Sequence, residues 1–104
     1  MDIGIIKADF NGLSDQKLYD SINSYRKDYP DFIIMTKDEN ISFIDINDVK
    51  YISINIDSNH VSRKEYYEER FEYISKHISD KLDSNGIKYK FIYTVGGNVS
   101  KISF

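Results

Sequence analysis

The chain has 104 residues, of which 40% are hydrophobic and 30% are charged, and its net charge is −3 at pH 7. These values describe one folded domain, and the negative charge argues against broad binding to a nucleic-acid backbone. The absence of cysteine excludes disulfides and cysteine-based zinc sites. No apolar run approaches the roughly 20 residues of a transmembrane helix, and the N-terminus lacks a basic signal region, so we expect a cytoplasmic protein without membrane contact.

The first helix is predicted from its ends and its apolar spacing. Ser14 can cap its N-terminus, and Pro30 ends it, because the residue before a proline avoids the helical region. Leu18, Ile22 and Tyr25 recur at helical spacing between these ends. They predict one buried stripe along the helix.

Three strand segments surround this helix in the sequence. Residues 3–8 (IGIIKA) are apolar on both faces, which is typical of a strand inside a sheet. Residues 32–36 (FIIMT) and 41–46 (ISFIDI) are joined by a short polar turn, so we expect them to pair as a hairpin. The next two residues, Asn47 and Asp48, form a linker-like break.

The second half begins with residues 51–56 (YISINI), whose alternation predicts a half-buried strand. A long helix follows, with a capping box formed by Ser62 and Glu65. Gly86 suits the left-handed position just past the end of a helix. Apolar residues recur every three or four positions between these ends: Tyr67, Phe71, Ile74, Ile78 and Leu82.

Residues 87–95 predict another strand, and residues 99–104 predict the last one. Gly96-Gly97 between them is a two-residue hairpin turn, which places Phe91 opposite Ile102. Three lysines then share the outer face, where they favour solvation and protection of a sheet edge: Lys88, Lys90 and Lys101.

The two halves of the chain resemble each other. The junction Asp9-x-Asn11-x-Leu13-Ser14 recurs as Asp57-x-Asn59-x-Val61-Ser62. We interpret this as a tandem βαββ repeat, with halves 1–48 and 49–104 in one domain, although the same junction is also ordinary turn and capping chemistry. The predicted fold is α+β, ferredoxin-like or palm-like, with a mainly antiparallel sheet and two helices on one face.

One candidate site combines residues from the two ends of the second half: Asp57, Asn59, Gly96, Gly97 and Asn98. The segments YISINIDSNHV and YTVGGNVSKISF place a carboxylate at the end of one strand and a Gly-Gly turn on its neighbour. In this respect residues 51–104 resemble the palm domain of GGDEF cyclases and CRISPR polymerases, with Asn98 in place of the acidic residue after the glycines. The resemblance implies nucleotide binding with Mg²⁺, the glycines approaching phosphate and Asp57 contacting the metal.

A second candidate site lies on the long helix, whose first turns carry four acids and two tyrosines: Glu65, Glu68, Glu69, Glu72, Tyr66 and Tyr73. Acids near a helix N-terminus also complement its dipole. Tyrosine beside charge is common at protein interfaces and also at the edges of cores. As an interface, this face would suit a basic groove on a protein partner, including a nucleic-acid-binding protein.

The two histidines, His60 and His77, have no further His or Cys at ligand spacing. We therefore predict no catalytic residues and no metal site.

These features favour a small acidic protein-binding module without enzymatic activity, a regulator or inhibitor. The composition is typical of an AT-rich genome, such as that of a low-GC bacterium or its phages, and suits a phage- or mobile-element-encoded inhibitor of a host defence enzyme. We expect a protein partner and no direct contact with nucleic acid, and a homodimer is compatible with the sequence. The alternative is a degenerate palm-like nucleotide-binding domain related to nucleotidyltransferases and cyclases, with Mg²⁺ as its cofactor.

Overall fold

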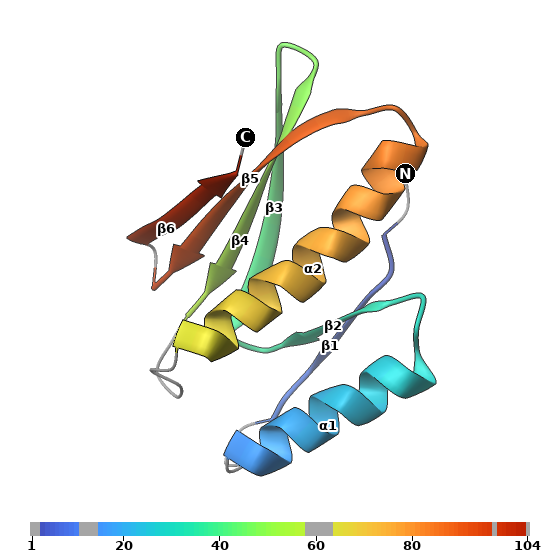
Figure 1. Cartoon of the computed structure of the whole chain (residues 1–104), viewed down its shortest axis with the longest axis vertical. Helices are drawn as coiled ribbons and strands as arrows, with labels where there is room; N and C mark the ends of the chain where they lie inside the picture. The colour runs from blue at the N-terminus through green and yellow to red at the C-terminus, as the bar shows by residue number, and fades with distance from the viewer. Residues whose placement is uncertain (1–2, 11–14, 58–63, 97, 104) are drawn as a thin grey trace. The chain divides into compact units, whose positions relative to one another are not determined.

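The computed structural model describes residues 3–10, 15–57, 64–96 and 98–103. Six strands and two helices follow one another in the order β1 (Ile5–Ala8), α1 (Asp15–Asp28), β2 (Ile33–Thr36), β3 (Glu39–Ile46), β4 (Val49–Ile56), α2 (Lys64–Ser84), β5 (Lys88–Val95) and β6 (Asn98–Ser103) (Figure 1). The predicted α+β class is confirmed. Neither of these helices combines the length and the apolar character needed to cross a membrane.

The chain divides into two compact units, Met1–Lys37 and Asp38–Phe104. Its strands form two sheets, one with the order β1-β2 and one with the order β3-β4-β5-β6. The prediction of a single sheet with both helices on one face is therefore wrong. The larger sheet is mostly antiparallel, because only its β4–β5 pairing is parallel.

The first unit is a βαβ motif. β1 and β2 pair in parallel, from Ile5 opposite Ile33 to Ala8 opposite Thr36, and α1 supplies the crossover that parallel strands require. All four residues of β2 are buried, as is Ile22 on α1. The predicted hairpin of residues 32–36 with residues 41–46 is wrong, since those segments pair with β1 and β4 instead.

In the second unit, β3 and β4 form a tight antiparallel hairpin. Asn47 and Asp48 form its turn with φ angles of 50° and 65°, the left-handed pair of a type I′ turn. What was expected to be a linker is thus a hairpin turn, and β3 pairs with β4 across the predicted boundary at residue 48. β4 then pairs in parallel with β5, so no strand is inserted between them, unlike in a ferredoxin-like split βαβ motif.

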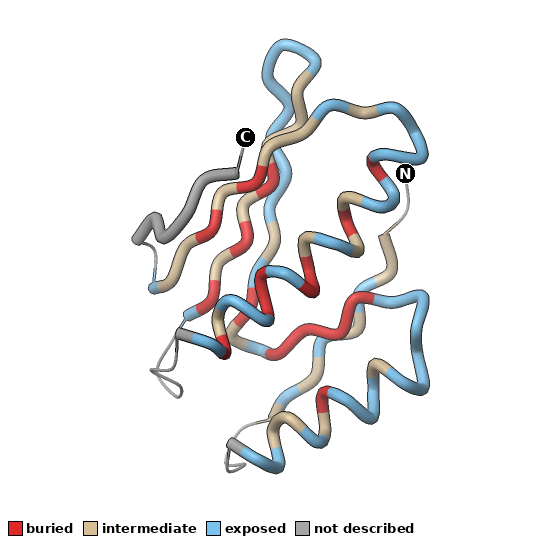
Figure 2. The backbone as a smooth tube through the Cα atoms, in the orientation of Figure 1, coloured by how far each residue is buried: buried red, intermediate tan, exposed pale blue. Residues whose placement is uncertain are grey.

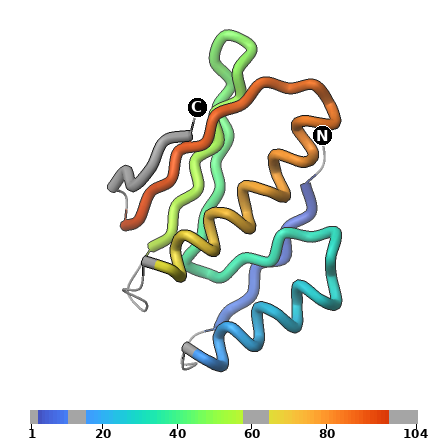
Figure 3. The backbone as a smooth tube through the Cα atoms, viewed as in Figure 1, coloured from blue at the N-terminus to red at the C-terminus, as the bar shows by residue number. Residues whose placement is uncertain are grey.

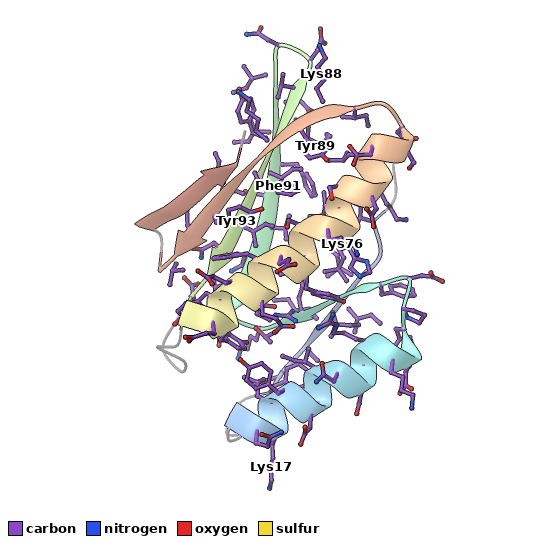
Figure 4. The ribbon with its side chains drawn as sticks, viewed as in Figure 1. Lys17, Lys76, Lys88, Tyr89, Phe91 and Tyr93 are labelled. Carbon is purple, nitrogen blue, oxygen red and sulfur yellow. The ribbon has the colours of Figure 1, made fainter. Side chains whose placement is uncertain are left out.

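One side of α2 packs against one face of the larger sheet. Phe71, Ile74, Ile78 and Leu82 are buried at the predicted spacing, and Figure 2 shows buried positions recurring along α2. They meet the buried residues of alternating positions on β4 and β5: Ile52, Ile54, Ile56, Phe91 and Tyr93. The ring centres of Phe71 and Tyr93 lie 4.9 Å apart, and the side chains of Phe91 and Tyr93 point from β5 toward the helix (Figure 4).

The end of α2 is as predicted. Gly86 has a φ of 67°, and its N–H donates to the carbonyl of Asp83 at 3.1 Å. The N–H of Ile87 donates to the carbonyl of Leu82 at 3.0 Å, which completes a Schellman motif. The predicted cap at Ser62 lies outside the described residues.

The β5–β6 hairpin contains a β-bulge that the sequence did not indicate. Val95 pairs with Asn98, as a two-residue turn requires, but the register shifts between Tyr93 and Thr94. Phe91 is therefore opposite Ser103 and not Ile102, and Lys101 is opposite Tyr93. The expected grouping of Lys101 with Lys88 and Lys90 rests on a register that the strands do not have.

A buried ion pair lies between the start of β3 and α2. The side chains of Glu39 and Arg70 are both 0% exposed, and they hydrogen-bond to each other. The sequence analysis did not identify either residue as part of the core.

Candidate functional site

The predicted nucleotide site lies where the parallel strands β4 and β5 end. Asp57 follows β4 and Gly96 follows β5, and the N–H of Gly96 donates to the carbonyl of Ile56 at 2.9 Å. Figure 3 shows the two strands side by side, ending near each other. Asp57, the next residue after Ile56, therefore lies close to Gly96. Asn59 and Gly97 lie outside the described residues, and Asn98 is placed only by its backbone pairing with Val95.

A chain of hydrogen bonds reaches Asp57 across the two strands. The Thr94 hydroxyl donates to Asn55 Oδ1 at 2.6 Å, and Asn55 Nδ2 donates to Asp57 Oδ1 at 3.1 Å. These bonds orient the carboxylate of Asp57, which is exposed. Asn55 and Thr94 face each other in the parallel register, which explains why the second strand contributes to this chain.

The site has too few carboxylates to bind two metal ions. A two-metal site requires carboxylates from both elements, and here the second element has Asn98 in the corresponding position. Within the described ranges, His, Asp and Glu side chains do not gather in a group of three. The residues therefore do not fit two-Mg²⁺ catalysis, although Asp57 can contact one Mg²⁺ that arrives with phosphates.

The four predicted acids of α2 form a continuous exposed stripe. Glu65, Glu68, Glu69 and Glu72 are all exposed, and their spacing of three and four residues places them on one face of the helix. Glu65 lies in the first turn, where a negative charge complements the helix dipole. This acidic stripe, Glu65–Glu68–Glu69–Glu72, can meet a basic surface.

The two tyrosines predicted beside these acids are buried. Tyr66 is 5% exposed and Tyr73 is 8% exposed, so they do not contribute to an accessible surface. The guanidinium of Arg70 lies 5.0 Å from the ring centre of Tyr73, and the ring of His77 lies 4.8 Å from it. Residues 66, 70, 73 and 77 follow helical spacing and form a second inward stripe. His77 therefore has a packing role, and His60 lies outside the described residues.

An exposed aromatic row in the first unit escaped the sequence analysis. The rings of Tyr25 and Tyr29 lie 6.2 Å apart, those of Tyr29 and Phe32 also 6.2 Å, and Phe10 contacts Tyr25 at 5.8 Å. Tyr29 is 45% exposed and Phe32 is 40% exposed. We call Tyr25, Tyr29 and Phe32 the aromatic row. Tyr25 was assigned to the inner stripe of α1, whereas it lies at the exposed boundary of that stripe.

Among the described residues, β1 carries one more exposed large apolar side chain, Ile5, and the β3–β4 hairpin carries three: Phe43, Ile44 and Ile46. Both faces of β3 contribute, because Phe43 alternates with the two isoleucines along the strand. These side chains are exposed because β3 is at the edge of its sheet.

Comparison of the chain with protein-family models, with curated proteins and with solved structures finds no match. The candidate sites therefore depend on their own geometry and chemistry.

Proposed function

We propose that this chain is a protein-binding module, a regulator or inhibitor without enzymatic activity. The aromatic row carries this proposal, because three neighbouring rings are exposed at the end of α1 and the loop that follows it. Tyrosine and phenylalanine are enriched at the centres of protein interfaces, where they bury large areas at low cost in side-chain entropy.

The acidic stripe of α2 is a second surface for the same function. Four exposed carboxylates on one helix face favour a basic groove on a partner, including a groove built for nucleic acid. A target of this kind suits an inhibitor of a host defence enzyme, encoded by a phage or another mobile element of a low-GC bacterium. A cytoplasmic location, favoured by the lack of cysteine, belongs to the same proposal.

Affinity capture from the native host with matched variants tests this function. The wild-type chain should retain a protein partner that Tyr25→Ser/Tyr29→Ser loses, and reversal of Glu68, Glu69 and Glu72 to Lys should weaken capture if that partner is basic. Lys17→Ala is the control, because Lys17 lies on α1 and its side chain points away from the helix at the other end from the row (Figure 4). Equal capture by the tyrosine variant and the control would contradict the proposal.

A second candidate function is binding of a nucleotide at the ends of β4 and β5. The hydrogen bond from the N–H of Gly96, which follows β5, to the carbonyl of Ile56, the last residue of β4, favours it. Ligands of open sheets with parallel strands bind at this edge. A nucleoside triphosphate with Mg²⁺ at 100 times its Kd would stabilise the protein by about 2.7 kcal/mol. An unchanged melting temperature with ATP, GTP and either Mg²⁺ or Mn²⁺ would exclude it.

The tandem repeat is proposed in a modified form. The two parallel motifs β1-α1-β2 and β4-α2-β5 have the same order, and in each an Asp follows the first strand directly, Asp9 and Asp57. This correspondence supports a duplicated βαβ unit. The relation between the sequence junctions Asp9–Ser14 and Asp57–Ser62 is consistent with it.

A further inference from the structure

The strand β3 forms one edge of the larger sheet, and among the described strands only β4 pairs with it. Three of its large apolar side chains are exposed, Phe43 at 41%, Ile44 at 59% and Ile46 at 51%. Edge strands are usually protected from pairing with other chains by proline or lysine, and β3 contains neither. Its free edge is therefore able to accept another strand.

The hairpin turn determines which backbone groups of β3 face the free edge. The type I′ turn at Asn47-Asp48 closes with Ile46 and Val49 as a hydrogen-bonded pair. Such pairs alternate along an antiparallel ladder, so the even-numbered residues of β3 bond to β4. The N–H and C=O groups of Ile41, Phe43 and Asp45 point outward.

We propose that two copies of the chain associate by antiparallel pairing of their β3 strands about a two-fold axis at Phe43. In this register Phe43 faces Phe43 of the second copy, and Ile41 and Asp45 face each other across the axis. These three positions are the ones with outward backbone groups, so they form roughly six new hydrogen bonds. The strand is thus complementary to itself, which a two-fold interface requires.

The burial of Glu39 favours this register over the neighbouring one. A shift that centres the pairing on Ser42 would place Glu39 opposite Asp45 of the second copy, and the side chain of Glu39 is fully buried in its ion pair with Arg70. Centred on Phe43, Asp45 faces an isoleucine and keeps its own salt bridge to Lys50 at 2.9 Å. On the other face of the sheet, the exposed Ile44 faces Ser42 and Ile46 faces Asn40. The apolar side chains of β3 therefore gain lateral neighbours in the dimer and lose part of their solvent contact.

Single cysteines test both the dimer and its register, because the natural chain has none. In a hydrogen-bonded antiparallel pair the Cα atoms are about 5.5 Å apart, within the range of a disulfide. Phe43→Cys should therefore form a disulfide-linked dimer under mild oxidation. Asp45→Cys is the matched control on the same edge, and its two cysteines would be about 13 Å apart.

Sedimentation of the wild-type chain measures the association directly. We expect twice the mass of the monomer at high protein concentration, and monomer for Phe43→Lys, which places two lysines opposite each other. Ser24→Lys, at an exposed position on α1, controls for the added charge and should remain dimeric. A monomeric wild type, or cross-linking of Phe43→Cys no faster than that of Asp45→Cys, would overturn the proposal. Circular dichroism establishes that both cysteine variants are folded, so the comparison does not depend on the lysine variant.

Discussion

Arg70 and Glu39 form a fully buried ion pair with two parallel hydrogen bonds. Arg70 Nε donates to Glu39 Oε2 at 2.7 Å, and Arg70 Nη2 donates to Glu39 Oε1 at 2.9 Å. The pair joins the middle of the first half of α2 to the first residue of β3, the edge strand of the same sheet. It therefore fixes the helix against a strand that the apolar contacts of α2 with β4 and β5 do not reach.

Replacing one member of this pair should be strongly destabilising. Glu39→Gln leaves the guanidinium of Arg70 buried without a counter-charge, and we expect a loss of about 3 kcal/mol in the free energy of unfolding. The double variant Glu39→Leu/Arg70→Met removes both charges and should lie within about 1 kcal/mol of the wild type. Urea denaturation measures both values. Equal losses in the single and double variants would contradict this account.

The charge of Arg70 should not limit stability at alkaline pH. Burial lowers the pKa of Arg70, but its hydrogen bond to Glu39 and the charge of Glu39 raise it more, so the net shift is upward. A raised pKa means that the stabilisation is present below the unfolded-state value and is lost only above it. Because the pKa of Arg70 is raised above that of an ordinary arginine, we expect the ion pair to remain charged at every pH at which the folded protein is measured.

Tyr89 should instead make the protein sensitive to high pH. Burial raises the pKa of the Tyr89 hydroxyl, and its hydrogen bond to Asp83 at 2.9 Å raises it further. The neutral tyrosine is favoured in the folded state, so its stabilisation is lost as pH rises through about 10 and above. Urea midpoints at about pH 8 and about pH 11 should fall less for Tyr89→Phe than for the wild type. An identical fall in both proteins would show that Tyr89 makes no such contribution.

Gly86 should be required for its conformation and not for space. Its φ of 67° is left-handed, and an added Cβ would meet no atom within 4 Å. Gly86→Ala should therefore cost about 1–2 kcal/mol through backbone strain alone. Gly86→Asn should cost less, because asparagine tolerates this conformation better. A thermal or urea titration of the two variants measures the difference, and equal costs would point to a lost contact instead.

Gly4 supports one end of the aromatic row. A Cβ at this position would lie 2.6 Å from Cδ1 of Phe32, so Gly4→Ala should displace the Phe32 ring. Because that ring is partly exposed it can move, and we expect a loss of about 1 kcal/mol, near the low end for overpacking. Phe32→Leu in the same chain should recover most of this loss. A variant as stable as the wild type with an unmoved ring, judged by its NMR shifts, would contradict the contact.

Local signals predicted the elements well but not their partners. The apolar spacing of α2 and the left-handed Gly86 depend on residues close together in the sequence, and both predictions were correct. The polar turn at residues 37–40 suggested that β2 and β3 pair with each other, but β2 pairs with β1 and β3 pairs with β4. A turn between two strands does not by itself determine whether those strands pair. The turn Asn47-Asp48 was the available signal for the β3–β4 hairpin.

The surfaces were predicted less well than the elements. The acidic stripe was correct as an exposed face, since charge and helical spacing determine it. Tyr66 and Tyr73 were predicted to be exposed, but they are buried, because α2 has a second inward stripe. Arg70 belongs to this stripe, and it is buried because it pairs with Glu39 on β3, far away in the sequence. The exposure of the aromatic row and of β3 depends on which segments lie at the edges. The spacing of apolar residues within one segment does not show whether that segment lies at an edge.

Site-specific photo-cross-linking in the native host tests the protein-binding function most directly. A photoreactive phenylalanine analogue at Tyr29 should cross-link a specific partner protein, because Tyr29 is the most exposed residue of the aromatic row. The same analogue at Lys17, on the same helix but away from the row, should not. If neither position yields a specific adduct, or if the adduct forms equally from Lys17, then the aromatic row is not a binding surface.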